Sequence, residues 1–163
     1  MALIQSALKK ASRATIELAA GLSEKKRGER WLHGVLLGYL ESSVGKMHSE
    51  YRVDRGRIDY RHGGNNPSVV ELVVRRHGVE YAPSANKTEL AKLCRIPNQQ
   101  ARTRYLLILD LSESTPLRKH VVQAAYRRHN SGRGRFHREC VRVMYVHPDA
   151  RHDFDFSWDP YAT

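Results

Sequence analysis

Two acidic residues lie within apolar segments of the sequence, where a buried carboxylate is energetically costly. Glu71 interrupts the apolar run of residues 69–74, and Asp59 lies between Ile58 and Tyr60. An isolated charge among such side chains costs several kcal/mol unless it is paired, protonated or bound to a metal. If the two segments form a hairpin across the loop at 63–67, their carboxylates converge at one edge. Two such oxygen ligands suit Mg²⁺ or Mn²⁺, with phosphate oxygens and water in the other positions.

A purely structural role for the two acids remains open from the sequence. Asp59 has Arg57 and Arg61 nearby in the chain, and Glu71 can pair with a basic side chain from a neighbouring element. Buried ion pairs of this kind also occur where no chemistry takes place.

The charge balance indicates a polyanionic partner. Lys and Arg number 28 against 17 Asp and Glu, a formal net charge of +11, which favours a nucleic acid, either DNA or RNA. No run of about 18–20 apolar residues is present, so we expect no membrane span. Arginine grips phosphate in bidentate fashion. The arginines expected to bind nucleic acid are Arg127, Arg128, Arg133, Arg135 and Arg138, with Arg102 and Arg104 in a second group.

Hydrophobic periodicity predicts an α/β fold. Helical spacing is found at 1–20, 24–45, 86–95 and 116–128, and strand-like runs at 51–53, 57–61, 69–74, 105–111 and 140–146. Strands that alternate with helices favour a central mixed β-sheet flanked by helices. Ser23 is the predicted N-cap of the second helix. Asp110 and Glu113 are interpreted as capping and turn residues.

Three segments divide the chain in this interpretation: an N-terminal accessory helix at 1–22, an α/β domain at 23–147, and an acidic aromatic tail at 148–163. On the first helix Leu3, Ile4 and Leu8 are apolar and could form an interface in a homodimer or larger complex. The tail is expected to pack through its aromatic side chains. Two cysteines without a secretory signal favour reduced thiols and a cytoplasmic location.

The order of these elements resembles the core of the PD-(D/E)XK nucleases, the restriction-endonuclease-like superfamily. Asp59 in Arg57-Ile58-Asp59-Tyr60 matches the central Asp of the motif, and Glu71 in Val70-Glu71-Leu72-Val73 matches its (D/E) position. Glu29, in the second helix, matches the optional first acid. The resemblance covers about residues 24–112 and implies metal-dependent hydrolysis of DNA, with Asp59 and Glu71 as ligands of Mg²⁺ or Mn²⁺.

One position departs from the family pattern. Val73 occupies the place of the motif lysine, which in the family orients the attacking water. Some members take the amine from the following helix, where Lys87 and Lys92 are the candidates. The resemblance therefore predicts a DNA endonuclease. The alternative is a non-catalytic, nuclease-like subunit that binds DNA or RNA in a repair, recombination, transposition or phage assembly.

Overall fold

A computed structural model describes residues 2–23, 26, 28–53, 56–76, 83–127 and 140–157. Its helices are α1 (Ala2–Ala20), α2 (Glu29–Val44), α3 (Pro83–Arg95) and α4 (Lys119–Arg127). Its strands are β1 (Met47–Val53), β2 (Gly56–His62), β3 (Ser68–Arg76), β4 (Thr103–Leu111), β5 (Cys140–His147) and β6 (Ala150–Ser157).

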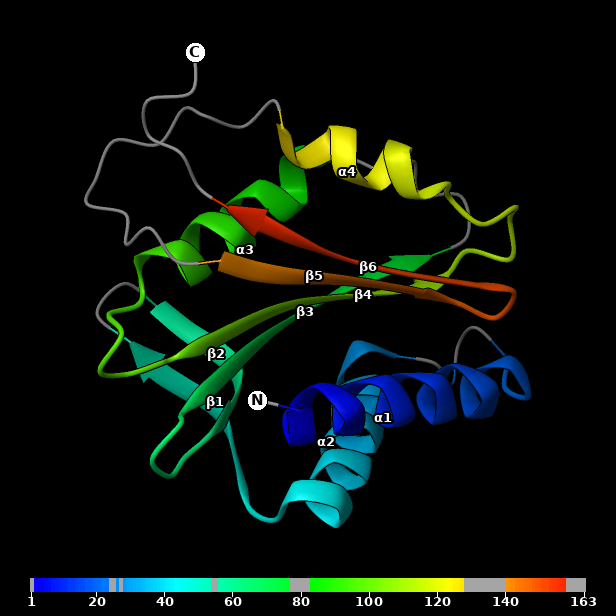
Figure 1. The fold of residues 1–163 in the computed structure, drawn as a ribbon. Coiled ribbons are helices and arrows are strands. Elements are labelled where there is room, and N and C mark those ends of the chain that lie inside the picture. The colour runs from blue at the N-terminus through cyan, green and yellow to red at the C-terminus, as the bar shows by residue number, and fades with distance from the viewer. Residues whose placement is uncertain are drawn as a thin grey trace.

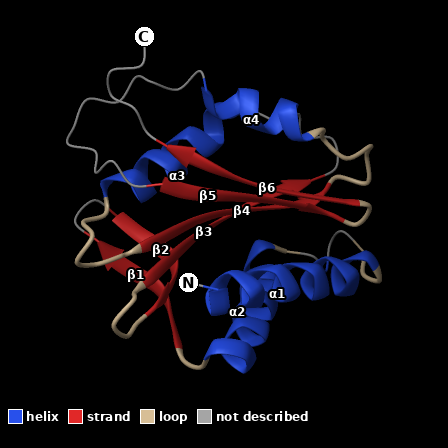
Figure 2. Cartoon of the chain, in the orientation of Figure 1, coloured by secondary structure: helices blue, strands red, loops and turns tan. Residues whose placement is uncertain are grey.

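The described strands form one mixed sheet of six in the order β1-β2-β3-β4-β5-β6. β3, β4 and β5 run parallel, while β1, β2 and β6 join by antiparallel pairing. α1 and α2 cover one face of the sheet, and α3 and α4 cover the other (Figure 1). Figure 2 shows the resulting three layers, with the sheet between two layers of helix. The predicted α/β class with a mixed sheet between helices is confirmed.

Each face of the sheet carries its own hydrophobic core. Along β3, Val70 packs with α1 and α2, whereas Val69 packs with α3. β4 alternates in the same way, with Leu107 on the first face and Leu106 on the second. Successive strand side chains point to opposite faces, so a strand covered on both sides must be apolar throughout. This explains the two runs of the sequence that are apolar at nearly every position.

The three apolar residues named on the first helix do not share one environment in α1. Ile4 and Leu8 are buried in the core shared with α2, while Leu3 is 67% exposed. The expectation that all three form an interface with a second copy is wrong for Ile4 and Leu8, because the sheet and α2 already cover them. The Thr15 hydroxyl is also buried and donates to the Ala11 carbonyl at 2.8 Å.

α2 begins five residues later than predicted from the Ser23 cap. Gly28 is its N-cap and has an extended ψ of 153°, and the first helical hydrogen bond runs from the Leu32 amide to the Gly28 carbonyl at 3.0 Å. Charge periodicity before Gly28 resembled helix, but the buried stripe of Leu32, Leu36 and Leu40 starts only after it. α3, by contrast, begins at Pro83, which is earlier than the predicted start at residue 86.

Residues 150–157, which the sequence interpretation assigned to a tail, form strand β6 on the edge of the sheet. Phe154 reaches the α3-side core. Asp155 lies opposite Arg142 in the register and receives a bidentate contact from it at 2.6 and 2.8 Å. Asp153 pairs with Lys9 of α1 at 2.9 Å. The acidic residues therefore alternate with aromatic ones, which is the pattern of a half-exposed strand. Trp158 and Tyr161 lie outside the described residues.

Candidate active site

β2 and β3 separate at Asp59. Their pairing ends at Tyr60 opposite Val70, and beyond it the Asp59 Oδ2 atom accepts a hydrogen bond from the Leu72 amide at 2.7 Å. Ile58 packs with the α3-side core, but Tyr60 packs with the α1–α2 core. Residues two apart normally share a face of a strand, so the regular alternation is broken at Asp59. We call this point the β2–β3 fork.

Strand β1 is irregular at the same level. Glu50 lies between the pairs Ser49–Tyr60 and Tyr51–Ile58, opposite Asp59, and adopts a left-handed φ of 48°. Few non-glycine residues adopt this conformation. The distortion therefore spans both strands that flank the Asp59 carboxylate.

Glu71 enters the fork from β3 on the face covered by α3. It is 1% exposed, and its Oε1 atom lies 2.6 Å from the Nζ atom of Lys92. The same ammonium lies 2.6 Å from Glu89 Oε2 and donates to the Arg57 carbonyl at 2.8 Å. α3 thus delivers an amine to the acid of β3.

Burial and the neighbouring Asp59 perturb the Glu71 carboxyl group. Burial raises the pKa of Glu71 to about 9, and the charge of Asp59 and hydrogen-bond contact with it add to this effect, while Lys92 opposes it. For Lys92, burial opposes the charged form, but the hydrogen bonds and charges of Glu71 and Glu89 outweigh it and raise the pKa. One ammonium therefore does not fully compensate the acids around it.

A cavity of about 800 Å³ opens beside the fork on the α2 side. Asp59 and Tyr60 line it from β2, and Glu29 and His33 line it from α2. Asp59 is therefore reached from the cavity, whereas Glu71 lies behind it in the protein. The remaining lining residues are Arg30, Gly34, Leu37, Ser49 and Glu50.

Tyr60 and His33 form a polar contact in the wall of this cavity. The Tyr60 hydroxyl lies 2.9 Å from His33 Nδ1 and donates to the His33 carbonyl at 3.2 Å. Burial, with the charges of Asp59 and Glu71, raises the pKa of Tyr60, so the phenol stays protonated. The Nε2 atom of His33 lies 3.9 Å from Glu29 Oε1. The spacing of Glu29 and His33 on one helical face was a usable signal that the sequence interpretation overlooked.

The structure brings together Asp59, Glu71 and Lys92, and it places Glu29 on the same cavity as Asp59. Lys87 belongs to α3, but its side chain is outside the described part of the chain. The catalytic and metal-binding roles of these residues stay predictions.

The predicted nucleic-acid-binding arginines divide into three groups. Arg102 is exposed and lines a second cavity, described below. Arg104 is 1% exposed, and its guanidinium donates to the carbonyls of Leu93 and Ile96 at 3.0 and 2.5 Å. The prediction that Arg104 contacts nucleic acid is therefore wrong, because the side chain is enclosed by the end of α3. Side chains of the third group, Arg127, Arg128, Arg133, Arg135 and Arg138, lie outside the described residues.

A second buried carboxylate was misinterpreted as a turn residue. Asp110 ends β4, is completely buried, and accepts hydrogen bonds from Arg75 Nη1 at 2.7 Å and the Tyr145 hydroxyl at 2.5 Å. The Ser112 amide and hydroxyl also donate to it, at 3.0 and 2.6 Å. Burial opposes its charge, but these donors together lower its pKa.

Within the described residues, no group of three or more His, Cys, Asp and Glu side chains has the arrangement of a metal site. In the same part of the chain, every helix is too short or too polar to cross a membrane. Comparisons with protein-family models, curated proteins and solved structures find no match for this chain.

Proposed function

We propose that the protein binds nucleic acid, DNA in preference to RNA, and hydrolyses its phosphodiester bonds at the β2–β3 fork with Mg²⁺ or Mn²⁺, as a restriction-endonuclease-like enzyme of the cytoplasm. The observation that carries this proposal is the meeting of Asp59, Glu71 and Lys92. It supplies two acids and one amine at one point, the set of groups that the resemblance to the PD-(D/E)XK nucleases implies, with the amine provided by α3.

The donor set of the fork fits a divalent cation. Asp59 and Glu71 present hard carboxylate oxygens in contact with each other, and burial of Glu71, together with repulsion between the two carboxylates, raises the pKa of Glu71. A bound cation would relieve this repulsion, and its remaining positions would be filled by water and phosphate oxygens. When bound, Mg²⁺ or Mn²⁺ supplies Lewis-acid stabilisation of the phosphoryl oxygens and lowers the pKa of a bound water.

Lys92 takes the role of the missing motif lysine in this proposal. Its side chain is held by Glu71, Glu89 and the Arg57 carbonyl, so the ammonium is positioned before substrate arrives. A fixed ammonium stabilises negative charge that develops on a phosphoryl group and can orient a water molecule beside it. By exchanging one of these three partners for a phosphoryl oxygen or a water, Lys92 would perform both tasks that Val73 cannot perform.

In this proposal, the residues of the cavity wall contact the substrate. Glu29, His33 and Tyr60 present polar atoms beside Asp59, and Tyr60 and His33 hold each other through their hydrogen bonds. We expect Glu29 to act as the optional first acid, through water or a partner group, because its carboxylate faces the cavity and not the fork itself.

The test is a cleavage assay on supercoiled plasmid, linear duplex, single-stranded DNA and RNA, in Mg²⁺, Mn²⁺ or EDTA, with binding scored in the same samples. Asp59→Asn, Glu71→Gln and Lys92→Met keep side-chain size, and Glu17→Gln on the exposed face of α1 is the matched control. We expect metal-dependent cutting that each fork substitution lowers by roughly a hundredfold or more while affinity is kept. Binding without cutting in every metal would overturn the enzyme.

A second candidate function is the non-catalytic nucleic-acid-binding subunit. The observation that favours it is that Lys92 already lies against two carboxylates, Glu71 and Glu89, which is also how an internal ion pair would look. In that case Glu71→Gln would change stability and affinity together, and the wild-type protein would bind without cutting.

A further inference from the structure

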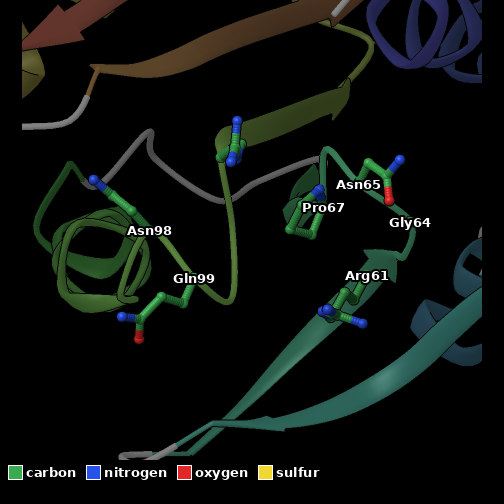
Figure 3. A pocket seen from close by; sticks show the side chains of 7 residues that line it. Arg61, Gly64, Asn65, Pro67, Asn98 and Gln99 are labelled. Carbon is green, nitrogen blue, oxygen red and sulfur yellow. The ribbon is translucent and has the colours of Figure 1, made fainter.

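A second cavity, of about 530 Å³, lies between two segments that are far apart in the sequence. The turn between β2 and β3 supplies one side, and the loop between α3 and β4 supplies the other (Figure 3). Its lining combines two arginines with three amide side chains, and no acidic side chain of the described residues joins them. These residues are Arg61, Arg102, Asn65, Asn98 and Gln99, with Gly64 and Pro67.

Arg61 is held in place on one wall. Its Nε atom donates to the Gln100 carbonyl at 3.4 Å, and its guanidinium carbon lies 4.6 Å from the centre of the Tyr51 ring. A guanidinium stacked on an aromatic ring loses less freedom when it binds an anion than a freely rotating one would. Arg102, by contrast, is exposed, and its side chain can close on a ligand.

The two walls are joined by buried polar contacts. The Pro67 carbonyl accepts hydrogen bonds from the amides of Arg102 and Thr103 at 2.7 and 3.3 Å. Buried Arg104 donates to Asn98 Oδ1 at 3.0 Å, as well as to the end of α3. Arg104 is therefore a positioning residue: it fixes the loop that carries Asn98 and Gln99. A concave site with fixed walls is built to receive a ligand.

The guanidinium and amide groups that line this cavity favour a nucleotide as its ligand. Guanidinium groups bind phosphate oxygens with charge-assisted hydrogen bonds, and Asn and Gln side chains offer donors and acceptors that match the edges of bases. The volume falls within the roughly 300–1,000 Å³ of small-ligand sites. A duplex is bound differently, by an element that enters one of its grooves, whereas an unpaired base can leave the stack and enter a pocket.

We propose that this cavity binds one unpaired nucleotide of a nucleic-acid strand, its phosphate between Arg61 and Arg102 and its base against the amides of Asn65 and Gln99. Arg61 follows Asp59 by two residues on β2, a distance of about 7 Å along an extended strand. A strand that continues along β2 from this cavity would bring a neighbouring phosphate towards the β2–β3 fork. In this part the inference rests on the proposed function, and it makes single strands and unpaired junctions the substrates.

The test measures binding by fluorescence anisotropy in EDTA, where no cutting occurs. Labelled single-stranded DNA, single-stranded RNA, continuous duplex and a duplex with an unpaired flap are compared at two salt concentrations. Arg102→Gln removes a guanidinium but leaves the amide that bonds Pro67, and Gln99→Ala removes an exposed amide. Arg118→Gln is the control, because Arg118 is an exposed arginine outside this cavity and loses the same charge.

We expect the single strands and the flap to bind roughly tenfold or more tightly than the continuous duplex. Arg102→Gln should weaken single-strand binding by roughly five- to tenfold and Gln99→Ala by about threefold, while Arg118→Gln changes it by less than about twofold. The two single-stranded probes show whether the sugar matters, since only RNA carries the 2′-hydroxyl. Equal affinity for duplex and single strand, or an Arg102→Gln effect no larger than that of Arg118→Gln, would overturn the proposal.

The binding experiment and the cleavage assay can reject the nucleotide site and the nuclease separately. Selective single-strand binding that depends on Arg102, without cutting by the wild-type protein, keeps the nucleotide site and rejects the nuclease. Cutting of continuous duplex that is unaffected by Arg102→Gln keeps the nuclease and rejects the nucleotide site.

Discussion

Glu71 and Asp110 are both buried carboxylates on neighbouring parallel strands, yet their surroundings shift the pKa in opposite directions. Asp110 receives hydrogen bonds from Arg75, Tyr145 and Ser112, which lower its pKa against the effect of burial. Glu71 shares one ammonium with Glu89 and touches Asp59, so burial and repulsion raise its pKa to about 9. Only Glu71 belongs to a group that reaches a large cavity, through Asp59.

The difference separates a structural acid from a candidate functional one. A carboxylate whose lone pairs are satisfied holds the fold together and has little left to offer a ligand. A carboxyl group whose charged form is disfavoured by burial and by a neighbouring carboxylate gains stabilisation of that form from a bound cation, and perturbed groups of this kind gather at functional sites. The comparison leads to four predictions, which concern stability and metal binding.

Asp110→Ala is expected to have the largest effect. It leaves the Arg75 guanidinium, whose side chain is 14% exposed, without its partner, and breaking a buried pair from one side costs about 3 kcal/mol or more. Urea unfolding at neutral pH measures the loss. Glu71→Gln should cause no loss under the same conditions, and a larger loss for Glu71→Gln than for Asp110→Ala would reverse the comparison.

Divalent metal should stabilise the fork and leave the Asp110 cluster unaffected. At a free concentration one hundred times its Kd, a ligand bound only to the folded state adds about 2.7 kcal/mol. Thermal unfolding at pH 8 with and without Mn²⁺ should therefore show a rise in Tm of roughly 5–10 °C. Asp59→Asn and Glu71→Gln should abolish the rise and Glu17→Gln should keep it. A rise that survives both fork substitutions would place the metal elsewhere.

Glu71 and Asp110 should also affect stability in opposite pH ranges. The folded-state pKa of Glu71 lies above its ordinary value of 4.5, at about 9, so its favourable contribution is complete in acid and is lost as pH rises through this range. Asp110 has a lowered pKa, so its contribution is present above its ordinary pKa and is lost in acid.

Glu71→Gln should remove the alkaline loss, with a gain over wild type on the order of 2 kcal/mol between pH 5 and pH 9. Urea unfolding of both proteins across this range gives the difference curve. Two parallel curves would show that Glu71 titrates as an ordinary carboxyl group.

The smallest expected effects come from two tyrosines. Tyr145→Phe removes a hydroxyl that donates to Asp110 and accepts from the Leu117 amide, and should cost about 2 kcal/mol. Tyr60→Phe removes contacts with His33 in the cavity wall, and should cost about 1 kcal/mol. Both losses are measured by urea unfolding. The opposite ranking would mean that the Tyr60 hydroxyl stabilises the fold more than the Tyr145 hydroxyl beside Asp110 does.

Much of this arrangement could be predicted from local pattern. The apolar runs of β3 and β4 required cover on both faces, and Glu71 within one of them indicated an unusual site before any coordinates were considered. Lys92 was one of two candidate amines because its helix follows β3 directly. The two-sided cover of β3 and β4 and the meeting of Glu71 with Lys92 could be predicted because they depend on short-range periodicity and on the cost of a charge among apolar side chains.

Other features depend on contacts that spacing alone does not reveal. Arg104 resembles any surface arginine in the sequence, and only the end of α3 that folds over it makes it structural. Asp110 acquires its role from Arg75 and Tyr145, which are both 35 residues away in the chain. Strand β6 was missed because the concentration of acidic residues was given more weight than their alternation with Phe154.

The most direct measurement compares plasmid cleavage by Asp59→Asn and by Asp110→Asn in Mn²⁺, at a temperature where both proteins are folded by circular dichroism. If the fork is the active site, Asp59→Asn stays folded and loses cutting by roughly a hundredfold or more, while Asp110→Asn is less stable but cuts nearly as wild type does. Retained cutting by Asp59→Asn, or no cutting by the wild-type protein, would contradict the account.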